Sequence, residues 1–409
     1  MRILWITNIP LPPICQALGF NSLPVGGWMY SSLKKIKQSG DIFAVATIYS
    51  GNEIIHKNIE GIDWYLLPLN GKSPFSYHKT LEHYWVKINN DFKPDIIHIH
   101  GTEFPHGLAY IRACGNEGVV ISIQGLISVY ARYYYIQDEY SWQKLITFRD
   151  FVKSDSITKR RYEFIKRGKL EVEMLKGVKH IIGRTEWDKA HTNAINPHAS
   201  YHYCGETLRD SFYINTWSYD HCKPYSIFVS QGTYPIKGLH KMLDAMPYIL
   251  RKYPNCHLYI AGSDITRTPW YKMSAYAKYI KLKIKDLNLS DNITFTGTLN
   301  EKAMCQQYLK SNVFVCPSAI ENSPNSLGEA QMLGMPYVCS YVGGIPELVD
   351  YNEATLYRYE ESEMLAEKIC QIFSLKDQFK CNVFDKDRYD SELNSSILVS
   401  IYRKILVDK

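Results

Sequence analysis

Short apolar runs alternate with longer helical patterns along almost the whole chain of 409 residues. The runs are rich in Val and Ile on both faces, which is typical of strands buried inside a parallel sheet. In the first half of the chain they predict strands at Ile3–Thr7, Ile42–Ile48, Trp64–Leu67, Asp95–Ile99, Val119–Ile123 and His180–Gly183. In the second half they predict strands at Tyr225–Ser230, His257–Ala261, Ile293–Phe295, Val313–Cys316, Pro336–Ser340 and Thr355–Tyr357.

Helical patterns separate these strands, at Trp28–Gln38, Lys79–Asn90, Gly238–Arg251, Trp270–Leu287 and Ser362–Phe373. Such alternation predicts an α/β protein made of doubly wound, Rossmann-like domains with parallel sheets. The pattern weakens over residues 205–224, so we predict domains at 1–204 and 225–389 joined by that linker. The amphipathic segment 390–409 is expected to pack back onto the first domain. Two such domains would face a cleft at the carboxyl ends of their strands.

The composition fits a soluble globular protein, with 45% hydrophobic and 22% charged residues. Ten scattered cysteines without a C-x-x-C pair exclude zinc fingers and disulfide scaffolds and suit a reducing compartment. The first apolar run is too short for a signal peptide, and no run approaches the length of a membrane span. We therefore expect a cytoplasmic protein. A net charge of +6 is modest for this length and argues against a nucleic-acid partner.

Basic residues concentrate between positions 151 and 180, where nine lysines and arginines face four acidic residues. Apolar residues are interleaved with them, which predicts a basic amphipathic helix. Two interpretations stay open: a solvated helix packed on the core, or a peripheral contact with anionic lipid headgroups. In the second interpretation the lipid contact would involve Arg160, Arg161, Lys166 and Arg167.

The stretch Pro317–Glu347 is the most informative part of the chain. Glu321 and Glu329 lie eight residues apart, across a loop and the start of a helix expected near Asn325–Ser326. Ser323, Asn325 and Ser326 are expected to cap that helix, whose free N–H groups suit a diphosphate. Glu321 would accept hydrogen bonds from sugar hydroxyls, and Glu329 would hold a ribose diol.

This stretch resembles the E-x7-E region of the retaining glycosyltransferases of family 4, which have the two-domain GT-B fold. The two glutamates are followed in the family's order by Ala330, Gly334, Pro336 and the pair Gly343–Gly344. The resemblance implies a nucleotide-sugar donor bound by the second domain. It assigns donor contacts in this region to Glu321, Asn325, Ser326, Leu327 and Glu329.

The resemblance extends to FVSQGTYPIKG at Phe228–Gly238, where Lys237 matches a lysine that grips the donor pyrophosphate. Gln231 stands where relatives usually carry an arginine, so it would hydrogen-bond the phosphate without neutralising it. The resemblance therefore implies Lys237, Gln231 and Glu321 as catalytic residues. The base is expected near Gly262–Asp264 and Gly297–Leu299, with Thr298 as a contact. The resemblance places the phosphate near the Gly-Gly turn, with Gly27 as the favoured glycine.

Polar residues that follow the strands of the first domain are candidates for the acceptor side of the cleft: His100, Glu103, Gln124 and Arg184. Gln124 replaces a histidine that many relatives carry near the transferred sugar. Arg184 would face the donor phosphate or an anionic acceptor, or else pair with Glu186 or Asp188. His98 and His100 share a strand face, but no third ligand is near, so we expect one packed histidine and no metal site.

The function implied is retaining, metal-independent transfer of a hexose-type sugar from a UDP- or GDP-linked donor. The implied acceptor is a glycan or a polyprenyl-diphosphate-linked glycan, in bacterial surface polysaccharide synthesis. Neither a cofactor nor a divalent metal is expected. Two alternatives stay open. An NDP-sugar 2-epimerase uses a similar two-domain fold, and a non-catalytic protein that binds nucleotide sugars is an alternative because Gln124 and Gln231 replace two of the family's usual groups.

Overall fold

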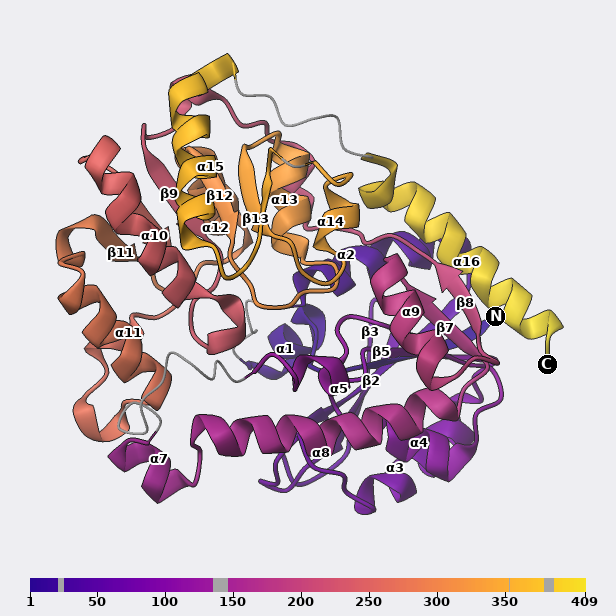
Figure 1. Ribbon diagram of the computed structural model, residues 1–409. Coiled ribbons are helices and arrows are strands. Elements are labelled where there is room, and N and C mark those ends of the chain that lie inside the picture. The colour runs from indigo at the N-terminus through magenta and orange to yellow at the C-terminus, as the bar shows by residue number, and fades with distance from the viewer. Residues whose placement is uncertain (21–25, 135–145, 353, 379–385) are drawn as a thin grey trace. The chain divides into compact units, whose positions relative to one another are not determined.

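The computed structural model describes residues 1–20, 26–134, 146–352, 354–378 and 386–409 (Figure 1). Its contacts divide the chain into two compact units. Unit 1 contains Met1–Val129, Phe164–Leu208 and Asp387–Lys409, and unit 2 contains Tyr130–Glu163 and Arg209–Lys386. Residues 130–163, which we expected in the first domain, therefore group with unit 2. The C-terminal segment groups with unit 1.

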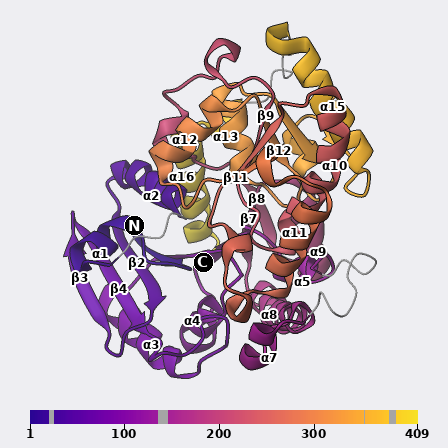
Figure 2. The same cartoon turned by 90° about the vertical axis from the view of Figure 1, so that its left-hand side faces the viewer.

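Unit 1 contains an eight-stranded sheet in the order β3-β4-β2-β1-β5-β6-β7-β8. Its strands are β1 (Arg2–Thr7), β2 (Ile42–Tyr49), β3 (Ile55–Ile59), β4 (Ile62–Pro68), β5 (Ile96–His100), β6 (Val119–Ser122), β7 (His180–Gly183) and β8 (Ser200–Tyr203). All neighbours pair in parallel except β3, which runs antiparallel to β4 at the sheet edge (Figure 2). The sequence predicted neither of the two edge strands, β3 and β8, because most of their side chains are exposed or only half-buried. Glu60 and Gly61, both with positive φ, make the tight turn into β4.

The helices of unit 1 cover both faces of its sheet and bury one core on each face. They are α1 (Pro12–Leu18), α2 (Gly27–Ile36), α3 (Thr80–Phe92), α4 (His106–Cys114), α5 (Ile127–Tyr130), α9 (Glu186–Ile195), α16 (Ser391–Val407) and the larger part of α8 (Ile157–Lys176). The C-terminal helix α16 packs on α2 and sends Tyr402 to the sheet. There the indole Nε1 of Trp5 donates to the Tyr402 hydroxyl, 3.0 Å away.

Unit 2 contains a six-stranded sheet in the order β11-β10-β9-β12-β13-β14, and every pair in it is parallel. The strands are β9 (Ser226–Val229), β10 (His257–Ile260), β11 (Ile293–Phe295), β12 (Val313–Cys316), β13 (Tyr337–Ser340) and β14 (Leu356–Tyr357). The helices are α7 (Phe148–Lys153), α10 (Leu239–Lys252), α11 (Ala275–Asp286), α12 (Glu301–Lys310), α13 (Asn325–Leu333), α14 (Ile345–Leu348) and α15 (Ser362–Leu375). The parallel, doubly wound sheets predicted from the sequence are confirmed in both units.

The strand order of unit 2 reverses between β9 and β12, because β10 continues the sheet on one side of β9 and β12 on the other. The helices that follow these two strands therefore leave the sheet in opposite directions, and their loops part at the carboxyl edge. Ligands of doubly wound sheets bind at this kind of switch point. The loops after β9 and β12 are thus where a site in unit 2 is expected.

Candidate functional site

The two loops at the switch point of unit 2 bring Lys237 and Glu321 into contact. The Lys237 ammonium lies 2.6 Å from Oε1 of Glu321, although 84 residues separate them. Ser318 donates its hydroxyl to the same oxygen, at 2.8 Å. Both bonds converge on Oε1, and the described residues offer Oε2 no partner. The side chain of Lys237 stays about one-fifth exposed, at 21%, so a ligand can reach it.

Backbone contacts hold these two loops together. The turn at Gly238 has φ +68°, and a β-carbon there would lie 1.7 Å from the carbonyl oxygen of Pro317. Only glycine therefore fits between the loops without a shift. The amide of Ala319 also donates to the carbonyl of Ile236, at 2.7 Å. The position of Lys237 against Glu321 is thus fixed by the main chain and does not depend on the ion pair alone.

The Gly343–Gly344 pair supports Glu321 from the other side. The amide of Gly344 donates to the carbonyl oxygen of Glu321, at 3.1 Å. Gly343 has φ +54°, and a β-carbon on it would lie 1.8 Å from the same oxygen. The two glycines, picked out by the sequence motif, let the main chain after β13 touch the main chain of the glutamate.

The electrostatics of this contact favour the protonated form of Lys237. Burial works to lower the pKa of Lys237, but the adjoining Glu321 carboxylate outweighs it and holds that pKa above its ordinary value. Lys237 is therefore protonated at neutral pH and keeps further N–H donors beyond the one that Glu321 receives.

Helix α13 begins beside this contact without a capping side chain. Its N-cap residue is Pro324, so the capping roles expected for Ser323, Asn325 and Ser326 are wrong. A proline side chain carries no hydrogen-bonding group, and the first N–H groups of the helix are left to a ligand or to water. Before the helix, the amide of Asn322 donates to the hydroxyl of Tyr130, at 3.1 Å. The side chain of Leu327 is fully buried in the core of unit 2, and its amide donates to the carbonyl of Pro324.

Glu329 lies on the buried side of α13 and faces Arg209. The guanidinium Nη2 of Arg209 lies 2.6 Å from Oε1 of Glu329, and both side chains are largely buried. Burial raises the pKa of Glu329 to about 7, and the positive charge of Arg209 opposes that shift. In this structure Glu329, which the resemblance assigns to the ribose, thus forms an ion pair with an arginine. Arg209 was missed from the sequence, where only its place between the buried residues Leu208 and Phe212 could have drawn attention to it.

Gln231 and Thr298, the other candidates of unit 2, are exposed on loops at the same sheet edge. Gln231 follows β9 by two residues. Thr298 follows Gly297, which exchanges two amide-to-carbonyl hydrogen bonds with Gly262 at 3.0 and 3.1 Å. These bonds hold the loops after β10 and β11 side by side at the carboxyl edge of the sheet.

In unit 1, His100 and Arg184 line one small buried pocket with His98, Trp28 and Glu206. Nη1 of Arg184 lies 2.9 Å from the carboxylate of Glu206. The pairing expected with Glu186 or Asp188 is therefore wrong for the guanidinium, although the backbone N–H of Arg184 does donate to Asp188. Arg184, which we expected to face the donor phosphate, thus forms an ion pair with an acidic residue of its own unit.

His98 is the packed histidine that the sequence predicts. Its ring lies within hydrogen-bond distance of the hydroxyls of Tyr402 and Ser122 and stacks on His100 at 3.8 Å between centroids. Burial lowers the pKa of both histidines, that of His98 to about 3. Both rings are therefore neutral at physiological pH. Within the described residues, no three His, Cys, Asp or Glu side chains are grouped so that they could hold a metal ion.

Glu103 lies at the switch point of unit 1, between β1 and β5. Its Oε2 accepts a hydrogen bond from Asn8, which follows β1, at 3.0 Å. Burial, followed by smaller contributions that include the nearby Glu171 carboxylate, raises the pKa of Glu103 to about 7. Gln124 approaches the sulfur of Met29 on α2, at 4.0 Å. Gly27 begins α2, and the glycine with positive φ is its neighbour Gly26, at +84°.

The basic segment forms α7 and α8, with Ser154 in a left-handed conformation after α7. Arginines that were considered for a lipid contact are bound within the chain. Arg160 pairs with Asp155 at 2.6 Å, Arg161 donates to the carbonyl of Ala131, and Arg167 donates to the carbonyl of Glu103. Among the residues described, no helix is long and apolar enough to span a bilayer.

Comparison with known proteins adds to this geometry. Residues 215–387 match the family described as glycosyl transferases group 1. The spore coat protein SA of Bacillus subtilis is 26% identical over 194 residues, which cover 45% of this chain and 50% of that protein. A GDP-mannose-dependent alpha-(1-6)-phosphatidylinositol monomannoside mannosyltransferase of Mycobacterium tuberculosis is 26% identical over 129 residues, which cover 30% and 31%. The chain thus spans at most about half the length of these curated relatives.

A sucrose-phosphate synthase from Thermosynechococcus elongatus has a similar solved structure. It matches over the full length of both chains with a TM-score of 0.72, at 15% sequence identity. At this identity the likeness concerns the fold alone, and it confirms the GT-B fold that the sequence predicts.

Proposed function

We propose that this protein transfers a sugar from a nucleotide diphosphate donor to a hydroxyl, because residues 215–387 match the family described as glycosyl transferases group 1. The contact between Lys237 and Glu321 at the switch point of unit 2 is the observation that carries the proposal. It sets an ammonium group and a carboxylate side by side where a doubly wound sheet binds its ligand.

The two residues have complementary roles in this reaction. As the bond between sugar and diphosphate breaks, negative charge grows on the departing phosphate, and Lys237 together with the uncapped start of α13 stabilises it. Oε2 of Glu321 accepts a hydrogen bond from a hydroxyl of the donor sugar and so orients the sugar. Oε1 accepts the hydrogen bonds from Lys237 and Ser318. Gln231 adds a neutral hydrogen bond to the phosphate. The acceptor hydroxyl attacks the anomeric carbon from the face that the phosphate leaves. It transfers its proton to the departing phosphate oxygen as the sugar–phosphate bond breaks, so the anomeric configuration is retained.

We assign no role to a divalent metal, because Lys237 and the helix start supply the positive potential that the leaving group needs. The donor is a UDP- or GDP-linked hexose. The acceptor is a glycan or a lipid-linked glycan of surface polysaccharide synthesis, bound by unit 1 near His100, Glu103 and Gln124. The name of the mycobacterial relative, which acts on a phosphatidylinositol mannoside, supports a lipid-linked acceptor.

A lipid-linked acceptor requires access to a membrane surface, and an exposed apolar patch of unit 2 supports such access. Helix α7 and the turn Trp270–Lys272 contact each other and expose Phe148, Phe151, Val152, Trp270 and Tyr271. Phe151 is 78% and Trp270 is 72% exposed. We call this group the aromatic patch of unit 2. Exposed aromatic rings of this kind insert into the interfacial region of a bilayer.

The charges around the aromatic patch favour an anionic surface. Lys153 and Lys272 are exposed on the same two elements. The one acid of α7, Asp150, is buried and accepts a hydrogen bond from the amide of Ala275, at 3.0 Å. We therefore place the peripheral contact on the cytoplasmic side of the membrane at this patch, in place of the arginines of α8.

The proposed function is tested by measuring nucleoside diphosphate release from UDP-glucose, UDP-galactose, UDP-N-acetylglucosamine and GDP-mannose. Each donor is incubated with the purified protein, with and without a polyprenyl-diphosphate-linked glycan, in the presence of EDTA. Release that depends on the added acceptor and survives EDTA supports the proposal. Loss of activity with EDTA contradicts the metal-independent mechanism. Conversion of the donor to its 2-epimer, or donor binding without release, would assign the chain to one of the two alternative functions.

A further inference from the structure

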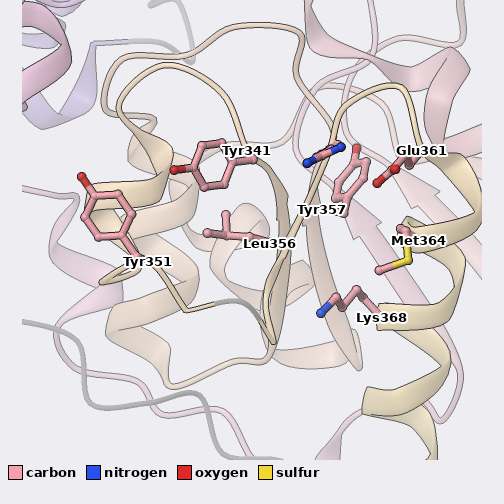
Figure 3. Close-up of a pocket in the computed structure, with 8 residues that line it drawn as sticks. Tyr341, Tyr351, Leu356, Tyr357, Glu361, Met364 and Lys368 are labelled. Atoms are coloured by element: carbon pink, nitrogen blue, oxygen red, sulfur yellow. The ribbon is translucent and has the colours of Figure 1, made fainter.

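A second pocket of unit 2 lies at the carboxyl ends of β13 and β14, the last two strands of its sheet (Figure 3). Its volume is about 540 Å³, within the range of small-ligand sites. It is lined by Tyr341, Tyr351, Leu356, Tyr357, Arg358, Glu361, Met364 and Lys368. None of these residues belongs to the contact of Lys237 with Glu321, so the pocket is a separate feature of the unit.

The lining combines exposed apolar faces with polar groups. Tyr341 and Tyr351 are 55% and 58% exposed, and Met364 on α15 is also exposed. Figure 3 shows Tyr341, Tyr351 and Leu356 on one side of the pocket and Tyr357, Glu361, Met364 and Lys368 on the other. The hydroxyl of Tyr357 is buried, and no described residue bonds to it. A buried hydroxyl without a partner costs free energy, which a ligand that bonds to it would recover.

Tyr351 has a backbone conformation that is unfavourable for a bulky residue. Asp350 and Tyr351 have φ values of +49° and +51°, in the left-handed region. A bulky side chain there costs about 1–2 kcal/mol relative to glycine. The chain nevertheless presents a large, exposed aromatic ring at this position. Strained residues of this kind concentrate at ligand sites.

We propose that this pocket is a saccharide-binding site, distinct from the donor site. A sugar ring has an apolar C–H face, which suits the rings of Tyr341 and Tyr351, and a rim of hydroxyls. Arg358, Glu361 and the hydroxyl of Tyr357 offer donors and acceptors to that rim. The site would hold part of the glycan chain away from the reacting sugar. The choice of ligand class rests on the proposed function, but the pocket itself does not.

Binding of three soluble probes tests the proposal: α-mannotriose, maltotriose and a glucuronate-containing tetrasaccharide. Saturation-transfer NMR and calorimetry are applied to the full chain. At least one probe is expected to bind, and Tyr351→Gly is expected to weaken it about tenfold or more. Because glycine relieves the left-handed strain, the same variant should keep or raise its melting temperature. Loss of binding with intact stability therefore separates a ligand contact from a structural role.

Three further variants complete the experiment. Arg358→Ala, another exposed position of the pocket, should also weaken the probe. Tyr133→Ala removes an exposed tyrosine of the same unit outside the pocket and should bind the probe as the unmodified protein does. Lys237→Ala should retain probe binding even where donor turnover is lost, which separates this proposal from the proposed function. The proposal would be overturned if none of the three probes binds, or if Tyr351→Gly and Arg358→Ala both bind the probe as tightly as the unmodified protein does.

Discussion

A β-carbon on residue 343 would lie 1.8 Å from the carbonyl oxygen of Glu321, so glycine at 343 and the position of that glutamate depend on each other. Gly343→Ala has to push the main chain of Glu321 away and separate its carboxylate from Lys237. Since misplacement by about 1 Å can cost a hundredfold in rate, we expect kcat of nucleotide release to fall by at least tenfold.

Gly334→Ala is the matched control for that variant. Gly334 also has a positive φ, +72°, but a β-carbon there meets nothing within 4 Å. Both variants should lose about 1–2 kcal/mol of stability from the left-handed conformation. The loss of turnover should be confined to Gly343→Ala. Equal turnover in the two variants would show that contact with Glu321 is not what requires glycine at 343.

Much of the fold could be predicted because buried parallel strands are continuous apolar runs. The strand at Val313–Cys316, for example, has the predicted bounds, and all four of its residues are buried. The edge strand β3 escaped prediction because its exposed side chains show no such run. Lys237 and Glu321 could be singled out because their neighbours Gly238, Gly343 and Gly344 are required by close main-chain contacts, which leave a motif in the sequence.

The partners of the candidate residues could not be predicted, because they come from distant parts of the chain. Glu329 meets Arg209 across 120 residues, and Arg184 meets Glu206 although Glu186 and Asp188 are nearer in sequence. The cap of α13 was also missed. Ser323, Asn325 and Ser326 favour capping by residue type, but Pro324 occupies the N-cap position. The path of the loop between β12 and α13, and not the capping preference of single residues, therefore decides where this helix begins.

The buried pair of Arg209 and Glu329 predicts a large loss of stability when one partner is removed. Arg209→Ala leaves a buried carboxylate unpaired and should lower the free energy of unfolding by about 3–5 kcal/mol, measured by urea denaturation. The double variant Arg209→Ala/Glu329→Gln removes the stranded charge and should regain part of this loss. Arg251→Ala, at an exposed position of α10, is the control and should change stability by less than about 0.5 kcal/mol. A double variant less stable than Arg209→Ala would contradict the conclusion that the unpaired carboxylate of Glu329 causes the loss.

The raised pKa of Glu103 predicts a pH dependence of stability. Burial raises this pKa from 4.5 to about 7, so between these values the folded state binds the proton more tightly than the unfolded state. The stability contributed by the neutral carboxyl is fully present below pH 4.5 and is lost as the pH rises through 7. Relative to Glu103→Gln, the unmodified protein should therefore lose about 2 kcal/mol between pH 4.5 and 7.5. Parallel pH curves for the two proteins would refute the shift.

The aromatic patch of unit 2 predicts binding to anionic membranes. The double variant Phe151→Ser/Val152→Ser removes two exposed apolar side chains of α7 and should reduce flotation with phosphatidylglycerol-containing vesicles severalfold. Ile214→Ser replaces another exposed apolar side chain of the same unit, 83% exposed, and should leave flotation unchanged. Binding that is the same in both variants would place the membrane contact elsewhere.

The central claim is that Lys237 and Glu321 hold the diphosphate and the sugar of a nucleotide-sugar donor. Its most direct test is calorimetric titration of the donor that turns over, and of its free nucleoside diphosphate, into the unmodified protein, Lys237→Ala and Glu321→Gln. Lys302→Ala, at an exposed position of α12, serves as the control. Lys237→Ala should weaken both ligands and lower turnover about a hundredfold, a loss of about 3 kcal/mol. Glu321→Gln should weaken the sugar-bearing donor more than the free diphosphate. Unchanged affinity and turnover in Lys237→Ala would contradict the account.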